Sequence, residues 1–144
     1  MAEYWLDTNT FIHAKNGPYS FDIAPGFWSL LEQKASEGVI ASTTLVYDEL
    51  VNNFQDELSD WAKAQRASGL FVEPNELVQV TFQQIADYVT QSYEVNQAAE
   101  FLSGADPWVI AHAKAHGGRV VTQEVRVGSN SRYSYNTSPW GRII

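Results

Sequence analysis

Acidic side chains occur in this sequence where apolar runs end or where a helix is expected to begin. Asp7 follows the apolar run at residues 4–6, Asp106 stands at an expected helix start, and Glu124 comes just after the apolar run at 120–121. Carboxylates that lie close together repel one another, and a hard divalent cation such as Mg²⁺ or Mn²⁺ removes that repulsion through oxygen ligands. With phosphate bound, such an ion can generate hydroxide and neutralise charge at phosphorus. If these acids meet, they predict hydrolysis of a phosphodiester bond.

The alternation of short apolar runs with helical patterns predicts that these acids do meet. Strand-like runs occur at residues 4–6, 39–41, 70–72 and 120–122. Such alternation indicates an α/β fold of three layers, α/β/α, with a central parallel sheet of four to five short strands. Ligands of such sheets bind beyond the carboxyl ends of the strands. We therefore expect Asp7, Asp106 and Glu124 at this edge, with Glu49 reaching in from the helix after the second strand.

Capping residues and apolar periodicity mark the helices between these strands. Asp7 or Thr8 can cap a first helix, and Thr43 is one of three candidate caps for the helix that carries Glu49. Proline suits a first turn and glycine a helix end, as at Pro107 in the last expected helix. Helices are expected at residues 8–15, 25–37, 44–54, 56–67, 75–93 and 105–116, with a further helical piece ending near 102.

Composition limits the class of protein. The chain has 144 residues, 44% of them apolar and 19 of them aromatic, which favours one globular domain over residues 1–144 and argues against disorder. No apolar run approaches 18 residues and no secretory signal is apparent, so we expect no membrane span and a cytoplasmic location. The absence of cysteine excludes disulfides, thiolate metal sites and a cysteine nucleophile.

The charge is unevenly distributed along the chain. The net charge of −8 argues against a nucleic-acid partner, but residues 1–106 hold 16 of the 17 acidic residues and only four of the nine basic ones. Residues 107–144 are therefore basic on balance, and a basic segment can contact phosphates. Residues 125–144 are polar and turn-rich, and we expect them to form an irregular tail.

Four segments, taken in chain order, resemble the acidic motifs of PIN domains. They are YWLDTN at 4–9, YDEL at 47–50, GAD at 104–106 and VVTQE at 120–124, and together they span roughly residues 3 to 124. The resemblance implies a metal-dependent endoribonuclease with RNA as its substrate. Small stand-alone PIN proteins are often toxins paired with an antitoxin, so the resemblance also implies an antitoxin protein as partner. A homodimer is compatible with it.

The resemblance assigns catalytic roles to the four acids. Asp7, Glu49 and Asp106 would hold Mg²⁺ or Mn²⁺, and Glu124 would be a fourth ligand or an outer acid. PIN domains more often have Asp or Asn at the position of Glu124. All four are the candidate catalytic residues.

Polar neighbours of the acids are the candidate substrate-binding residues. Thr8 and Asn9 would orient Asp7 and the substrate phosphate, and Thr122 would contact the substrate from the end of the fourth strand. A PIN domain of this kind would add a helix and a fifth strand after the fourth motif, and the sequence after residue 124 shows neither pattern clearly. We interpret the C-terminal part as atypical or truncated.

Two other chemistries fit the sequence less well. A phosphatase with an aspartyl nucleophile also begins with an aspartate after its first strand, but it requires a second acid where this chain has Asn9. His112 and His116 have a spacing that can bind zinc, but no third ligand accompanies them.

A PIN-like module that binds protein or RNA without catalysis is the alternative from a different class. In that case the acids would be structural caps, and the acidic first two-thirds of the chain would suit a binding surface. Metal binding by Asp7 and Asp106 separates the two hypotheses, because only the enzyme requires it.

Overall fold

A computed structural model describes residues 2–122, so Glu124 and the expected tail at 125–144 lie outside the described residues. The elements in chain order are β1 (Tyr4–Leu6), α1 (Thr8–Asn16), α2 (Pro25–Ser36), β2 (Ile40–Thr43), α3 (Thr44–Asn53), α4 (Glu57–Ala64), the 3-10 turn η1 (Arg66–Ser68), β3 (Phe71–Val72), α5 (Glu76–Ser92), α6 (Val95–Ser103), α7 (Asp106–His116) and β4 (Arg119–Val121). In this part of the chain, every expected strand and helix is present with small shifts at the ends. None of these helices combines the length and the apolar character needed to cross a membrane.

The described strands form one parallel sheet in the order β3-β2-β1-β4. In the register of β1 with β4, Trp5 lies opposite Val120, and Leu6 lies opposite Val121. The expected parallel sheet is thereby confirmed with four strands. The carboxyl ends of β1 and β4 lie side by side, which brings the residues that follow each strand to one edge.

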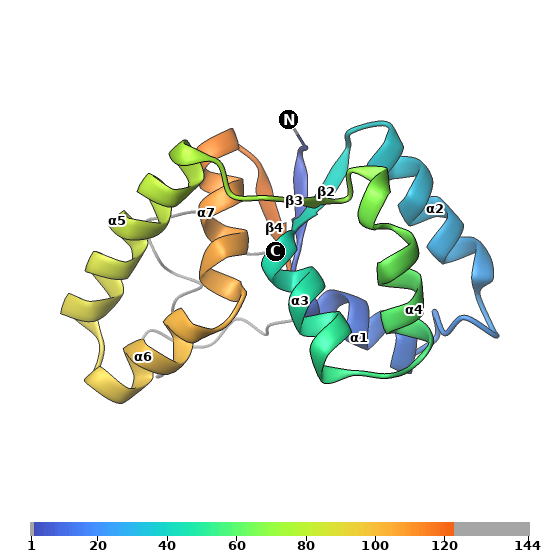
Figure 1. The fold of residues 1–144 in the computed structure, drawn as a ribbon, viewed down its shortest axis with the longest axis horizontal. Helices are drawn as coiled ribbons and strands as arrows, with labels where there is room; N and C mark the ends of the chain where they lie inside the picture. Colours follow the sequence, from blue (N-terminus) through green and yellow to red (C-terminus); the bar gives the residue numbers. More distant parts are fainter. Residues whose placement is uncertain (1, 123–144) are drawn as a thin grey trace.

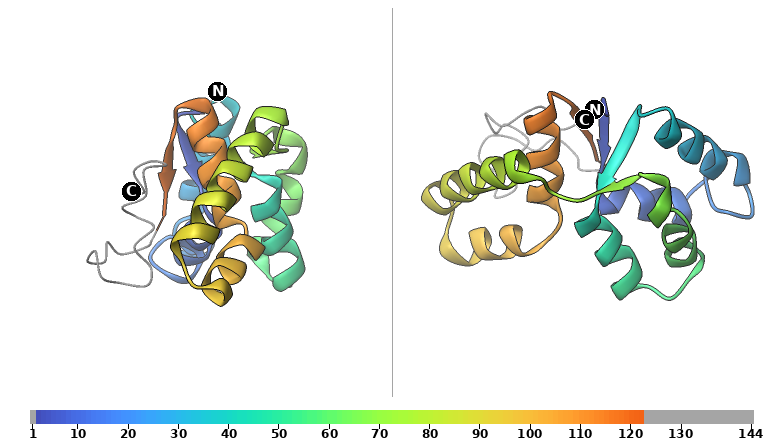
Figure 2. Two further views of the ribbon diagram at one scale, coloured as in Figure 1. Left: turned by 90° about the vertical axis from the view of Figure 1, so that its left-hand side faces the viewer. Right: turned by 45° about the horizontal axis from the view of Figure 1, so that its top comes forward.

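Helices lie on both sides of this sheet (Figure 1). Helices α5, α6 and α7 form one group, at the left of Figure 1, and α1, α2 and α4 lie on the opposite side. The tilted view in Figure 2 shows the same separation, with α3 following β2 between the two groups. The α/β/α layering expected from the sequence is present. The helix that carries Glu49 therefore lies where both groups can contact it.

The centre of the sheet is built around Trp5, whose side chain is fully buried. Its ring stacks on His112 at 4.7 Å and on His116 at 5.8 Å between centroids. Nε2 of His112 lies 3.1 Å from Oγ1 of Thr43, whereas Nδ1 of His112 and Nε2 of His116 are buried with no hydrogen-bond partner among the described residues. A Cβ atom at Gly118 would come within 2.8 Å of the Trp5 ring, so only glycine allows the chain to enter β4 here.

Burial sets the protonation state of this histidine pair. Burial, with a contribution from His116, lowers the pKa of His112 to about 4, and burial also lowers the pKa of His116. Both imidazoles are therefore neutral near pH 7, with His112 in the core and His116 partly buried at its edge. Within residues 2–122 no group of three or more His, Asp or Glu side chains is arranged to hold a metal ion, so the zinc alternative gains no support.

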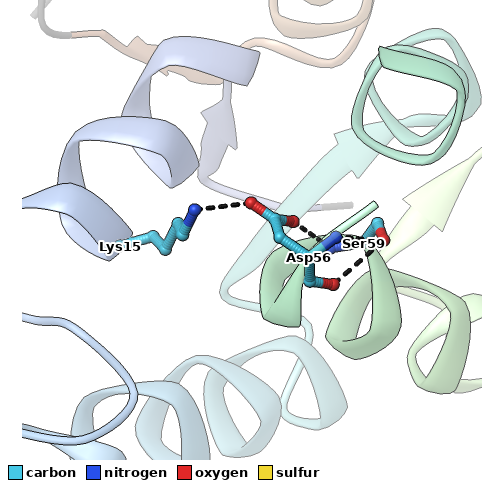
Figure 3. Close-up of polar contacts among 3 residues, drawn as sticks. All are labelled: Lys15, Asp56 and Ser59. Atoms are coloured by element: carbon cyan, nitrogen blue, oxygen red, sulfur yellow. Dashed lines mark hydrogen bonds and ion pairs between the residues drawn. The ribbon is translucent and has the colours of Figure 1, made fainter. Parts of the chain in front are cut away.

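An ion pair joins the end of α1 to the start of α4 (Figure 3). Nζ of Lys15 lies 2.5 Å from Oδ2 of Asp56. Oδ1 of Asp56 accepts a hydrogen bond from the amide of Ser59, and the Ser59 side chain accepts one from the amide of Asp56, which completes a capping box. The hydrogen bond from Lys15 is the main cause that lowers the pKa of the Asp56 carboxyl. These contacts fix the orientation of α1, whose first turn carries Thr8 and Asn9.

Candidate functional site

Asp7 lies at the carboxyl edge of the sheet, between β1 and β4. Its amide donates a hydrogen bond to the carbonyl oxygen of Val121, at 3.3 Å. Its side chain is 4% exposed and caps α1, with Oδ1 accepting from the amide of Thr10 at 2.8 Å and from Oγ1 of Thr10 at 2.6 Å. The Thr10 hydroxyl also lies 2.9 Å from the carbonyl oxygen of Val121. The first candidate acid therefore also stabilises the junction of α1 with β4.

Glu49 connects three segments that are far apart in the sequence. Its Oε2 accepts a hydrogen bond of 2.5 Å from Oγ1 of Thr8, at the start of α1. Its Oε1 accepts one of 2.9 Å from the amide of Ala105, the residue before α7. Amides at a helix start have no partner within the helix, so the Glu49 carboxylate satisfies one of them. The carboxylate thus holds the start of α1 and the start of α7 against α3.

A hollow of about 600 Å³, here called the main hollow, collects several of the candidate residues. Thr8, Asn9, Glu49 and Asp106 all line it. They come from the start of α1, from α3 and from the first turn of α7, so the fold brings together residues from three of the four motifs. Asp106 is the first residue of α7 and is half-buried.

The remaining candidate residues lie elsewhere. Asp7 is not among the residues that line the main hollow, although its neighbour Thr8 is. Thr122 is buried at the end of β4. Glu124 lies outside the described residues, so its role as a fourth acid stays a prediction. The catalytic roles of Asp7, Glu49 and Asp106 also stay predictions.

The donor set in the main hollow suits one kind of metal site. Among residues 2–122 no three acidic or histidine side chains are positioned to bind one ion together. However, Glu49 and Asp106 present two carboxylates to the same hollow, and a carboxylate oxygen that accepts one hydrogen bond retains a second lone pair. Mg²⁺ is often held by one or two carboxylates with waters and phosphate oxygens in its other positions. The residues present fit a metal bound in that way.

The contribution of α6 to this hollow was not predicted from the sequence. Tyr93 precedes this helix, and Glu94, Gln97, Glu100 and Phe101 lie along the side of it that lines the hollow. Their spacing of three and four residues places them on one helix face, and this periodicity is the signal that would have found them. Since the residues lining the hollow include no lysine, arginine or histidine, the described wall is acidic and aromatic.

The fold is that of the PIN-like proteins, as the resemblance led us to expect. A chain of the solved structure of VapBC2 from Rickettsia felis, bound to a DNA fragment from its promoter, matches with a TM-score of 0.60. The match covers 98% of this chain and 96% of that chain at 17% sequence identity, so the likeness concerns the fold. A chain of FitAcB from Neisseria gonorrhoeae matches with a TM-score of 0.49 and 22% identity, over 84% of this chain and 87% of that one.

The sequence family is narrower than the fold. Residues 4–136 match the family described as "Domain of unknown function (DUF4411)", and the chain belongs to that family. No curated protein matches the sequence. The family description names no activity.

Proposed function

We propose that this chain is a metal-dependent endoribonuclease, a hydrolase that cleaves phosphodiester bonds in RNA. The observation that carries the proposal is the main hollow, in which Thr8, Asn9, Glu49 and Asp106 meet beside the carboxyl edge of a PIN-like sheet. This is the edge at which open parallel sheets bind ligands. Acidic oxygen donors from separate segments that share a hollow at this edge can be joined by a cation or by a substrate.

The residues have distinct roles in this proposal. Glu49 and Asp106 would hold Mg²⁺ or Mn²⁺, with Asp7 as a third ligand or as the residue that sets the α1 start, and Glu124 as a further acid. When bound, the metal would supply a nucleophilic hydroxide and neutralise charge at phosphorus. Asn9 would donate hydrogen bonds to the phosphate through its amide.

Two further residues would orient a metal ligand or contact the substrate without binding the metal themselves. The Thr8 hydroxyl donates a hydrogen bond to Glu49, which helps to orient that carboxylate. Thr122 lies buried directly after β4, and it would contact the substrate from the end of that strand.

We further propose that the chain is the toxin of a toxin–antitoxin pair. The PIN-like fold and the small size of the chain support this role, because a nuclease of this kind requires a restraining partner. An antitoxin protein would be the partner and cellular RNA the substrate, with the chain as monomer or homodimer and in the cytoplasm.

A specific observation also favours the non-catalytic binding module. Both oxygens of Glu49 and Oδ1 of Asp7 already accept hydrogen bonds that connect elements of the fold. In this alternative the acids act as caps and connectors, and the hollow binds a protein or RNA without cleaving it.

Cleavage assays separate the two candidates. Structured and single-stranded RNAs would be incubated with Mn²⁺, with Mg²⁺ and with EDTA, using wild type, Asp106→Asn, Asp7→Asn and the control Asp87→Asn, which removes one charge from the exposed side of α5. Asparagine is also a good helix cap, so Asp7→Asn keeps the fold. We expect metal-dependent cleavage by wild type and Asp87→Asn, and a loss of at least a hundredfold in the other two variants.

Two results would contradict the enzyme. Cleavage that survives undiminished in both Asp106→Asn and Asp7→Asn would remove this site from consideration. Absence of cleavage by wild type, together with calorimetry that detects no Mn²⁺ binding, would favour the binding module.

A further inference from the structure

A second hollow of about 230 Å³, here called the flanking hollow, adjoins the main hollow. The two share a wall made by Glu49 and Asn53 of α3 and by Gly104 and Ala105 before α7. The hydrogen bond between Glu49 and the amide of Ala105 runs through this wall. A ligand in the flanking hollow would therefore lie directly beside one bound in the main hollow.

The flanking hollow has its own lining on the other side of the wall. Asp48 and Asn52, which lie one turn apart on α3, supply a carboxylate and an amide, and Trp108 of α7 supplies an indole ring. Trp108 stacks on Phe82 of α5, with 3.8 Å between ring centroids and 8° between planes. This stacking holds the indole in one orientation, so the hollow has an aromatic surface that is rigid before a ligand arrives.

The volume and the chemistry of the lining together indicate a flat ligand with hydrogen-bond donors. The volume lies below the roughly 300 to 1,000 Å³ of sites for drug-sized ligands, which favours a single ring system. An aromatic side chain is a stacking surface for an unpaired nucleobase. A carboxylate accepts a hydrogen bond from the amino group of cytosine, and an asparagine amide pairs with the amino group and ring nitrogen of adenine.

The absence of cations from the residues lining the flanking hollow defines which part of a nucleotide fits. Without lysine, arginine or histidine in that lining, a phosphate would be repelled by Asp48 and Glu49. A base that carries an exocyclic amino group would instead donate to them. Uracil has no such group and would offer these acceptors only its single ring N3–H, so it would make fewer hydrogen bonds to them than a base with an amino group.

We propose that the flanking hollow binds an unpaired base of single-stranded RNA that carries an exocyclic amino group, as adenine and cytosine do, stacked on Trp108 and recognised by Asp48 and Asn52. This base would be the neighbour of the phosphate held in the main hollow. The position relative to the cleaved bond rests on the proposed ribonuclease function, but binding of the base itself requires neither metal nor cleavage.

Binding in EDTA tests the inference separately from catalysis. The anisotropy of fluorescein-labelled short homopolymers of adenylate, cytidylate and uridylate would be measured with the whole chain. We expect wild type to bind the adenine or cytosine polymer at least fivefold more tightly than the uracil polymer. Trp108→Leu should lose at least fivefold in affinity for the preferred polymer, because stacking on an aromatic side chain contributes substantially to each bound base.

Matched controls distinguish recognition from folding and from overall charge. Phe82→Leu removes the ring that Trp108 packs against but leaves every residue lining the hollow in place, so it should lose less affinity than Trp108→Leu. Asp48→Asn should reduce the preference over uracil, whereas Asp87→Asn, which removes the same charge from α5, should keep it. Asp48 is exposed, so its replacement leaves the fold intact.

The inference would be overturned if wild type bound the three polymers equally, or if Trp108→Leu and Asp48→Asn both kept the wild-type preference. Failure of the proposed nuclease would look different: RNA would bind with the expected preference in EDTA and remain uncut when Mn²⁺ was added.

Discussion

At the scale of single residues, Glu49 acts as an acceptor that two other segments share. Thr8 donates to one of its oxygens and the amide of Ala105 to the other. The hydroxyl of Thr8 and the carboxylate of Glu49 therefore depend on each other, and removal of either leaves a polar partner that is partly buried without its hydrogen bond. Such a loss costs about 1 to 3 kcal/mol.

A double-mutant cycle measures this dependence. We expect Thr8→Val to lower the free energy of unfolding by about 1 to 2 kcal/mol, and Glu49→Met, which removes both acceptor oxygens, to lower it by at least as much. The double variant should lose less than the sum, because the two side chains form one interaction. Urea denaturation of the four proteins provides the values. Additive losses would mean that the hydrogen bond contributes little to stability.

At the scale of elements, the orientation of α1 depends on a contact at its far end. The start of α1 is held by Asp7 and Glu49, and its end is held by the ion pair of Lys15 with Asp56 (Figure 3). Asp56 is also the N-cap of α4, so one carboxylate serves two helices. The candidate site at the start of α1 is therefore stabilised from the α4 side of the molecule.

The two roles of Asp56 can be separated. Asp56→Ala removes the cap and the ion pair and should lower the free energy of unfolding by about 1 to 2 kcal/mol. Lys15→Met removes only the ion pair, whose side chains are 27% and 26% exposed, and should cost less than about 1 kcal/mol. Thermal unfolding in low and high salt tests this, since only the ion-pair part should weaken with salt. Equal losses in both variants would contradict a capping role.

Several features of the site follow from local sequence, and others depend on packing. The position of Asp7 is predicted by the apolar run before it and by its suitability as a helix cap. The orientation of Glu49 toward the interior is predicted by its helical spacing from Leu45 and Leu50. Both patterns are local, so the sequence predicts them. The amide of Ala105 as the partner of Glu49 depends on how α7 packs on α3, and no local pattern encodes that.

The histidines of α7 illustrate the same limit. The spacing of His112 and His116 is compatible with a metal, but a spacing does not reveal that both rings stack on Trp5, a residue of the first strand. Likewise, the flanking hollow depends on how α3, α5 and α7 pack together. The sequence of each helix alone predicts only that the helix is amphipathic or buried.

At the scale of the whole molecule, the histidine pair of α7 links stability to pH. The unfolded chain binds a proton at His112 below about pH 6.5, whereas the folded protein holds the pKa of His112 at about 4. The unfolded state therefore binds more protons between these values, and stability rises with pH across that window. His116, whose pKa burial also lowers, acts in the same direction.

We expect the free energy of unfolding to fall by about 3 kcal/mol for His112 alone as the pH is lowered from 6.5 to 4. His112→Gln should reduce this slope, because glutamine does not titrate. Urea denaturation at several pH values measures both proteins. The carboxyl of Asp56, whose pKa is lowered, contributes only below its ordinary value of 3.8, so its effect lies outside the histidine window. An unchanged slope in the variant would contradict the assignment to His112.

The pairing of the first strand with the last described strand has a consequence during synthesis of the chain. Tyr4 pairs with Arg119, and the amide of Asp7 donates to Val121. At the rate of ribosomal synthesis, β4 is made on the order of 10 s after β1. Until then the nascent chain has α1 and α3 but no β4 beside Asp7. If the proposed nuclease activity requires that edge, the messenger RNA under translation is protected from its own product until β4 has been synthesised.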